Sequence, residues 1–338
     1  MIERALVAGL GSIGERHLRL LRAALPEADI RVLRHSGCNG DIPNADGCFD
    51  RLEDACAFVP QLAIVSTPSP FHLQAARELA QAGAHLLVEK PISDRLDGVA
   101  DLLALCAEKD LVLQIGYNLR FLLTLQRFRT EIRSGHIGKV HTVHCEIGQY
   151  LPEWRPGSDY RDGVSGRADL GGGVLLELSH ELDMLRWVFG EVAWVGAWCG
   201  RQSALEVDVE DSAMLTLGLI GGPVVQLGMD FLRRDATRVC TAIGATGSLR
   251  WDAVAGEVTQ YDPFTGMWRV LMADRPERDA SYCAQIETFL ERITGGVSNA
   301  TAADGSDGLE VLRVVEAARR SAGQDGRRVV VVATGSSR

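Results

Sequence analysis

Six residues near the start of the chain have a spacing that could hold a dinucleotide. Gly9-Leu10-Gly11-Ser12-Ile13-Gly14 reads G-x-G-x-x-G, after a short apolar strand and before a helical pattern. The first glycine permits a tight turn, the second lets the backbone approach a pyrophosphate, and the third lets helix and strand pack closely. The helix N-terminus adds free N–H groups and a partial positive charge. We therefore expect a dinucleotide site at Gly9, Gly11, Ser12, Ile13 and Gly14.

The end of the next strand indicates which dinucleotide is preferred. NAD-binding chains of this kind carry an Asp or Glu about 20 residues past the glycines, where it bonds the ribose 2′-OH. Here the stretch is Leu33-Arg34-His35-Ser36. Arg34 would attract a 2′-phosphate that a carboxylate would repel. Arg34 and Ser36 therefore favour NADP, with NAD possible. The alternative is that Arg34 is solvated or stacks on adenine.

A lysine follows a later strand, in Val88-Glu89-Lys90-Pro91-Ile92. Ligands of open α/β sheets bind outside the carboxyl ends of the strands. Lys90, held by the following proline, would point a cation at the working end of the cofactor. By itself the pattern fits a surface lysine at a turn equally well. Ser93 is expected to cap the helix that follows.

A histidine lies among acidic residues further along the chain. Glu177, His180 and Asp183, with Met184 and Trp187, share one face of an expected helix at i, i+3 and i+4 spacing, while a second, leucine-rich face should pack on the core. A carboxylate beside an imidazole orients it and stabilises its charged form, which suits a general base. The alternative is a solvated helical face with i, i+3 pairs.

The stretch from Leu151 to Arg161 is rich in aromatic and cationic residues. Trp154, Tyr160 and Arg161 are of types that stack on sugars and bind anionic groups. An ordered surface loop is the alternative. No metal site is expected, because His141 and His144 face opposite sides of a strand-like run.

These residues require two architectures to position them. From residue 1 to 118, short apolar strands alternate with helices, which predicts a doubly wound parallel sheet covered on both faces. From 119 to 338, longer strand-like runs with hairpin-like turns predict an α+β domain with a large open, mostly antiparallel sheet. One helix, about Val174 to Phe189, interrupts that sheet. A helix over 308–322 and a short strand from Arg328 to Val332 close the chain.

Composition excludes several classes of protein. The formal charge of -10 over 338 residues argues against binding to nucleic acid or to an anionic membrane. The eight cysteines form no C-x-x-C pair, which predicts buried free thiols in a reducing compartment. The first residues lack the apolar run of a signal peptide, and no stretch is long enough to span a bilayer. We expect a cytoplasmic protein.

Several of these segments together resemble the glucose–fructose oxidoreductase / inositol dehydrogenase / rhizopine-catabolism (Gfo/Idh/MocA) family. The matching segments follow the order of the family over the first 190 residues: Gly9–Gly14, Thr67–His72, Glu89–Pro91, Gly116–Phe121, Gly171–Gly173 and His180–Asp183. The resemblance implies a Rossmann domain and a second domain whose sheet often forms an oligomer interface, here a homodimer or homotetramer. It also implies hydride transfer at a carbinol carbon of a sugar or polyol.

The resemblance also implies roles for individual residues. Lys90 matches the active-site lysine of the family, His180 its catalytic histidine and Asp183 the acid three residues further on. The other matches concern binding: Thr67, Pro68, His72 and Glu89 near the cofactor, and Asn118 and Arg120 near the substrate. The family often has an aspartate four residues before the histidine, where this chain has Leu176. Glu177, three residues before the histidine, is the nearest acid and the candidate for binding the substrate. The Lys90–Pro91 peptide is expected to be cis.

Taken together, these features predict an NAD(P)-dependent dehydrogenase or reductase of a sugar, sugar acid or nucleotide sugar. His180 would take the hydroxyl proton, and Lys90 would stabilise the same oxygen. Two alternatives are an enzyme that keeps its cofactor bound for transient oxidation, in elimination or transhydrogenation, and a non-catalytic NADP(H)-sensing regulator.

Overall fold

The computed structural model describes residues 2–35, 37–38, 40–155, 157–296 and 301–331. The chain divides into two units. The first comprises Met1–Phe121 and Arg278–Leu312, and the second comprises Leu122–Glu277 and Arg313–Arg338. No helix among the described residues is both long and apolar enough to cross a membrane.

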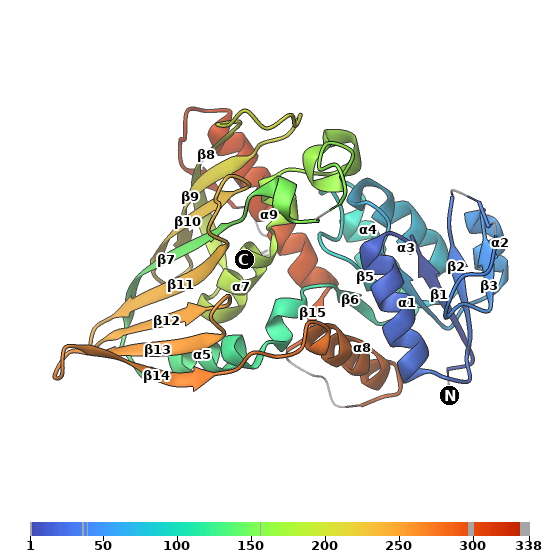
Figure 1. The fold of residues 1–338 in the computed structure, drawn as a ribbon, viewed down its shortest axis with the longest axis horizontal. Helices are drawn as coiled ribbons and strands as arrows, with labels where there is room; N and C mark the ends of the chain where they lie inside the picture. Colours follow the sequence, from blue (N-terminus) through green and yellow to red (C-terminus); the bar gives the residue numbers. More distant parts are fainter. Residues whose placement is uncertain (1, 36, 39, 156, 297–300, 332–338) are drawn as a thin grey trace. The chain divides into compact units, whose positions relative to one another are not determined.

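The first unit contains a seven-stranded sheet in the order β15-β6-β5-β4-β1-β2-β3 (Figure 1). All neighbouring strands are parallel except β15, which pairs antiparallel with β6. Its strands are β1 Arg4–Ala8, β2 Asp29–Leu33, β3 Gly47–Phe49, β4 Leu62–Val65, β5 His85–Val88, β6 Leu113–Ile115 and β15 Ala303–Asp304. The apolar residues of β1 and β4 are fully buried, as expected for a sheet covered on both faces.

The connections of this sheet determine where a ligand binds. Its helices are α1 Ser12–Ala24, α2 Leu52–Ala57, α3 His72–Gln81, α4 Val99–Glu108, α8 Ala280–Ile293 and the first part of α9 Gly305–Ala322. From β1 the chain moves one way to β2, and from β4 it moves the other way to β5. Right-handed crossovers then place α1 and α3 on opposite faces. The strand order therefore reverses between β1 and β4, and ligands of such sheets bind at the carboxyl ends there.

Two details differ from the sequence-based expectations. The segment Arg278–Leu312, expected in the second domain, belongs to the first unit. The reason is that Ile286 and Phe289 of α8 pack in the core that α1 covers, while β15 extends the sheet beside β6. Ser93 caps no helix: its Oγ accepts a hydrogen bond from the N–H of Arg95, and α4 begins only at Val99, after Gly98.

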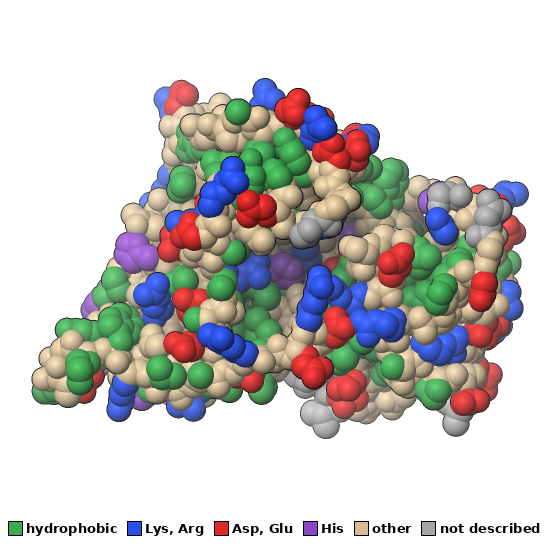
Figure 2. Space-filling view, viewed as in Figure 1, with side chains coloured by type: hydrophobic (Ala, Val, Ile, Leu, Met, Phe, Trp, Pro, Cys, Tyr) green, Lys and Arg blue, Asp and Glu red, His purple; other side chains and the backbone are tan. Residues whose placement is uncertain are grey.

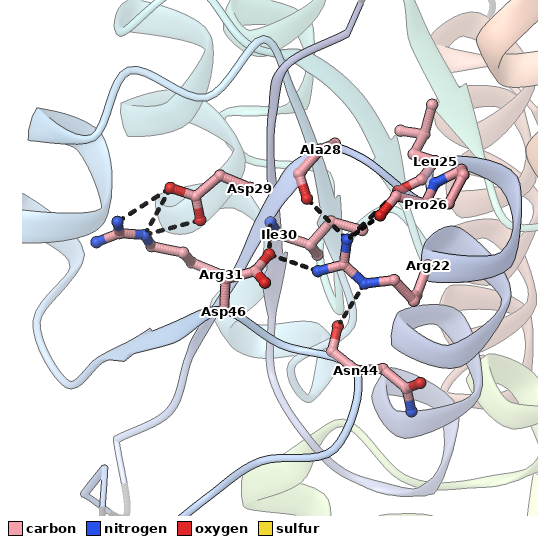
Figure 3. Close-up of polar contacts among 9 residues, drawn as sticks. All are labelled: Arg22, Leu25, Pro26, Ala28, Asp29, Ile30, Arg31, Asn44 and Asp46. Carbon is pink, nitrogen blue, oxygen red and sulfur yellow. Dashed lines mark hydrogen bonds and ion pairs between the residues drawn. The ribbon is translucent and has the colours of Figure 1, made fainter.

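The connection between β2 and β3 is held at two points. The first point lies just before β3. There Arg22 of α1 donates to backbone carbonyls, among them Asn44 O and Ala28 O, and forms an ion pair with Asp46 (Figure 3). Asp46 also accepts the N–H of Ile30. Burial would raise the pKa of Asp46, but this hydrogen bond and the Arg22 charge hold it below its ordinary value.

The second point is a disulfide between Cys38 and Cys48, whose Cα atoms lie 5.6 Å apart. The expectation of free thiols is therefore wrong for this pair. Because β3 pairs with β2, Cys48 lies close to the segment that follows β2 and contains Cys38. The spacing of ten residues between the two cysteines does not by itself predict this. The other six cysteines are free: Cys56, Cys106, Cys145, Cys199, Cys240 and Cys283.

The second unit contains a nine-stranded sheet in the order β14-β13-β12-β11-β7-β10-β9-β8-β16. Only the β7–β10 pair is parallel among the pairs described, so the expectation of a mostly antiparallel sheet is confirmed. Its strands are β7 Val140–Gly148, β8 Val192–Gly200, β9 Ser212–Leu219, β10 Val224–Asp230, β11 Thr237–Gly244, β12 Ser248–Asp252, β13 Glu257–Asp262, β14 Met267–Ala273 and β16 Val329–Val330. The expected closing strand extends to Val332, which lies outside the described residues.

The two faces of this sheet differ. Helices α5 Leu123–Arg133 and α7 His180–Phe189 lie along one face (Figure 1). There Trp251 of β12 is fully buried, and its Nε1 donates to Thr124 at 3.1 Å. Strand β10 alternates exposed and buried residues, as a half-buried strand does. The opposite face therefore presents exposed side chains, among them Trp198, Met214 and Val224.

Candidate active site

The glycine loop has the shape expected of a dinucleotide-binding turn. Gly9 has a φ of +92°, and its N–H donates to Leu33 O at the end of β2. An added Cβ at Gly14 would lie 2.0 Å from Gly9 O, so α1 could not pack this close to β1 with any larger residue. Ser66, which follows β4, donates its Oγ to Ala8 O and Gly9 O at 3.0 Å each. These contacts hold the loop at the point where the strand order reverses.

Space and donors are present where a pyrophosphate would lie. A Cβ at Gly11 would meet nothing within 4 Å, so the requirement for glycine there does not come from the surrounding residues of the chain. Helix α1 begins after Gly11 without a side-chain cap, which leaves N–H groups of its first turn for an anion. Among the described residues, the buried Oγ1 of Thr67 has no hydrogen-bond partner. The residues present therefore fit a dinucleotide.

The residues expected near the ribose follow β2 directly. The N–H of Arg34 donates to Phe49 O at 2.8 Å, and the preceding residue, Leu33, accepts from Gly9. Arg34 therefore directly follows the residue that bonds the glycine loop, and its side chain is partly exposed. Ser36 lies outside the described residues.

Lys90 leaves the sheet at the end of β5, beside β4. Its peptide to Pro91 is cis, which confirms the expectation. Glu89 accepts the N–H of Lys90 at Oε2, and its Oε1 lies 2.7 Å from Nε2 of His17. Burial would raise the pKa of Glu89, but the hydrogen bond to His17 and the charge of Lys90 hold it below its ordinary value. The residue before Lys90 is therefore a buried carboxylate.

His72, expected to line the cofactor, is buried and bonded at both ring nitrogens. Its ring is buried between two carbonyl oxygens, Nδ1 at 2.8 Å from Pro91 O and Nε2 at 2.6 Å from Thr67 O. Two acceptors favour the doubly protonated ring, but burial, the larger effect, lowers the pKa of His72. The ring links the segment after β4 to the segment after β5.

Asn118 and Arg120, expected near the substrate, are buried in a 3₁₀ turn over Asn118–Phe121. Asn118 donates its Nδ2 to Ser281 Oγ at 2.9 Å. Arg120 forms a two-pronged ion pair with Asp307, in which both N–O distances are 3.0 Å. These contacts join the turn to α8 and α9 within the first unit.

The expected helix over Val174–Phe189 is in fact two helices. α6 ends at Glu177 and α7 begins at His180, with Leu178 and Ser179 between them. His180 is therefore the first residue of α7, and Asp183 lies one turn further on the same helix. Glu177 belongs to the other helix and accepts a hydrogen bond from Ser165 Oγ at 2.8 Å, so the expected single stripe through Glu177 and His180 is wrong.

Helix α7 has no solvated face. Asp183, Met184 and Trp187 are as buried as the leucines expected to form its core face. Glu181 is fully buried, and an oxygen of its carboxylate lies 2.7 Å from Nε of Arg238 on β11. The helix is thus enclosed by protein, and partly exposed His180 is at its N-terminal end.

The aromatic loop is ordered by contacts of its own residues. Trp154 donates its Nε1 to Gln149 O and packs edge-on against Phe231, with ring centroids 5.1 Å apart. Tyr160 OH accepts the N–H of Glu206. Arg161 pairs with Asp159 and Glu206, and its hydrogen bond lowers the pKa of Asp159 to about 2. A part for these residues in substrate binding stays a prediction.

Sequence reasoning missed His17, although its spacing from Gly14, Leu18 and Leu21 places it on the buried face of the expected helix. His17 lies three residues after Gly14 and is fully buried on the same side of α1. A histidine on the buried face of a helix needs a polar partner, and Glu89 is that partner. Ser66 was also missed, because no motif marks a hydroxyl after β4.

Comparisons with known proteins agree with this geometry. Residues 4–117 match the model of an oxidoreductase family with an NAD-binding Rossmann fold. Residues 125–250 match the GFO/IDH/MocA C-terminal domain. Among solved structures, the WlbA dehydrogenase of Bordetella pertussis, in complex with NADH and UDP-GlcNAcA, is similar in fold. Its TM-score is 0.81 at 23% identity, over 98% of this chain and 100% of that chain.

Characterised and uncharacterised relatives match along most of the chain. The uncharacterised oxidoreductase YrbE of Bacillus subtilis is 30% identical over 76% of this chain and 74% of its own length. The rhizopine catabolism protein MocA of Rhizobium meliloti is 24% identical over 94% and 95%, respectively. With a Rossmann unit, a second unit built on an open sheet, and family models that match both, the chain belongs to the Gfo/Idh/MocA oxidoreductase family.

Proposed function

We propose that the chain is an NAD(P)-dependent dehydrogenase or reductase that acts on a carbinol or ketone carbon of a sugar, sugar acid or nucleotide sugar. The observation that carries the proposal is the placement of Lys90. It follows the strand next to β4 and is preceded by a buried carboxylate, in the sheet whose glycine loop leaves open space at Gly11.

Relatives support the substrate class. A dTDP-3,4-didehydro-2,6-dideoxy-alpha-D-glucose 3-reductase of Streptomyces violaceoruber is 29% identical over 86% of this chain. A myo-inositol 2-dehydrogenase of Thermotoga maritima is 26% identical over 76% of it. The first name gives a nucleotide-linked deoxysugar with ring carbonyl groups and the second a cyclitol, so an oxygenated sugar or cyclitol ring is the substrate we propose here.

The proposed chemistry assigns one task to each side chain. The bound dinucleotide supplies the hydride acceptor or donor. Lys90 Nζ donates a hydrogen bond to the reacting oxygen of the substrate and stabilises its negative charge. His180 accepts the proton of the same hydroxyl during oxidation and returns it during reduction. Asp183, one turn along α7, orients the imidazole.

A substrate screen tests the proposal. The protein is mixed with NADP or NAD and a panel of sugars, sugar acids, cyclitols and nucleotide sugars, and absorbance of the reduced nicotinamide is followed. We expect turnover on at least one of these sugar or cyclitol rings, and a strongly reduced rate in Lys90→Met. If both cofactors bind and none of these compounds is oxidised, nor any matching ketone reduced, the proposed function is wrong.

For the cofactor, we propose a preference for NADP through Arg34. A charge-assisted bond to the 2′-phosphate contributes about 1.5–3 kcal/mol, so Arg34→Asp should weaken NADP binding by about 100-fold and NAD binding far less. Isothermal titration with both cofactors measures this. The matched control is Arg51→Asp, the same charge change at an exposed arginine of the first unit. Equal dissociation constants for the two cofactors in the unaltered protein would exclude the preference.

For assembly, we propose a homodimer or homotetramer through the uncovered face of the nine-stranded sheet. Figure 2 shows hydrophobic side chains gathered over its β13–β14 end. There Trp268 and Val270, two residues apart and so on the same face of β14, are 47% and 56% exposed. A face of this kind marks a protein contact. Light scattering should give two or four times 36.6 kDa, and Met214→Glu with Trp268→Glu should shift it toward the monomer. A monomer mass for the unaltered protein at micromolar concentration would contradict the proposal.

A further inference from the structure

A buried histidine lies against the carboxylate that precedes Lys90. His17 is fully buried, and its Nε2 is 2.7 Å from Glu89 Oε1. The other oxygen, Oε2, accepts the backbone N–H of Lys90 at 3.1 Å. One carboxylate therefore joins a side chain of α1 to the backbone of Lys90.

The surroundings leave the Glu89 carboxylate little freedom. A Cβ added at Gly116 would lie 2.8 Å from Glu89 Oε2, so the carboxylate packs directly against that backbone. The ring of His17 is itself held edge-on by Tyr282 of α8, with ring centroids 5.9 Å apart. A buried carboxylate is costly unless it is hydrogen-bonded, and His17 is the side chain that bonds it at Oε1.

The same helix begins at the dinucleotide site. His17 is three residues after Gly14, where α1 packs against Gly9 O. On the far side of Lys90, His72 bonds Pro91 O and Thr67 O. The Lys90–Pro91 segment is thus held by one histidine from α1 and one from α3, and only the former belongs to the helix whose N-terminus faces the pyrophosphate.

We propose that His17 is a positioning residue that fixes the backbone of Lys90, through Glu89, relative to the N-terminus of α1. This inference rests on the proposed function of Lys90. The position of Lys90 relative to the pyrophosphate site then depends on the two hydrogen bonds of the Glu89 carboxylate, to His17 and to the N–H of Lys90, and not on the loop conformation alone.

Three variants separate this role from simple packing. His17→Phe keeps the ring volume and the contact with Tyr282 but removes the donor. His17→Gln keeps an N–H donor near the place of Nε2. Leu18→Ala, at the neighbouring buried position of α1, is the matched control, because it loosens the core without touching Glu89.

The readout is the rate at which Lys90 is labelled by an amine-reactive reagent, measured by peptide mass spectrometry, together with kcat and the KM for NADP. A hydrogen bond to a buried charged group is among the stronger ones in a protein, so its loss should be measurable. We therefore expect His17→Phe to change Lys90 labelling severalfold and to lower kcat by about tenfold or more, with a much smaller change in KM. His17→Gln should recover most of both. Leu18→Ala should lower the melting temperature but leave labelling and kcat near the unaltered values.

The inference is overturned if folded His17→Phe labels at Lys90 and turns over like Leu18→Ala. Should His17→Phe not fold, Glu89→Gln serves instead, and it too must change Lys90 labelling. Labelling needs no turnover, so it decides the matter even if Lys90→Met retains full activity. That last result would refute the proposed function of Lys90 and leave the positioning contact itself to be judged from labelling alone.

Discussion

Replacing His180 by alanine should lower turnover by about 10²–10⁴-fold, the contribution typical of a positioned general base. Lys90→Met should cost a similar factor, because a donor aimed at a developing oxyanion contributes about 3 kcal/mol. If both side chains serve one oxygen, the double variant should lose less than the product of the two single losses. Neither change should much alter the dissociation constant for NADP, since the pyrophosphate is assigned to the glycine loop.

Steady-state kinetics on the substrate found in the screen measure these factors. His141→Ala and Lys109→Met are the controls, because both residues are exposed and lie outside the proposed site. Retention of most of the turnover in His180→Ala would refute the assignment. If the double variant loses as much turnover as the product of the two single losses, the two side chains act independently.

Alanine at two glycines of the same loop should have opposite consequences. Gly14→Ala places a Cβ 2.0 Å from a backbone oxygen, so α1 must move away from β1. We expect a loss of about 1–3 kcal/mol or more of unfolding free energy, together with loss of cofactor binding. Gly11→Ala meets nothing within 4 Å and has a φ of −74°, which alanine adopts freely. Its stability should be unchanged, while its NADP affinity falls by about 10–100-fold, since a backbone approach worth a few kcal/mol is blocked.

Thermal melts without cofactor and titrations with NADP separate the two effects. An apo melting temperature for Gly11→Ala well below that of the unaltered protein would show that the loop itself, and not a ligand, requires glycine there. Unchanged NADP affinity in Gly11→Ala would remove the pyrophosphate from this position. A stable, cofactor-binding Gly14→Ala would contradict the close packing of α1 on β1.

Local patterns were sufficient for much of the fold. The alternation of strands and helices predicted the parallel sheet, and hairpin turns such as Gly221-Gly222-Pro223 predicted antiparallel pairs such as β9 with β10. Such features depend on residues close together in the chain, so periodicity and turn chemistry reveal them.

Other features depended on contacts that no local pattern contains. Helix α8 joins the first unit because its apolar face packs beside α1, more than 250 residues away in the chain. The break between α6 and α7 lies in a stretch whose period reads as one helix. Cys38 and Cys48 meet only because β3 pairs with β2.

The sequence by itself determined the family, the glycine loop and the candidates Lys90 and His180, because each is a short motif with its own physical reason. Only the tertiary structure decided what surrounds them. It showed His72 turned toward two carbonyl groups, Arg120 committed to Asp307, and His17 bonded to Glu89. A buried polar side chain takes its role from the partner that folding brings to it, and those partners here are 5 to 187 residues away along the chain.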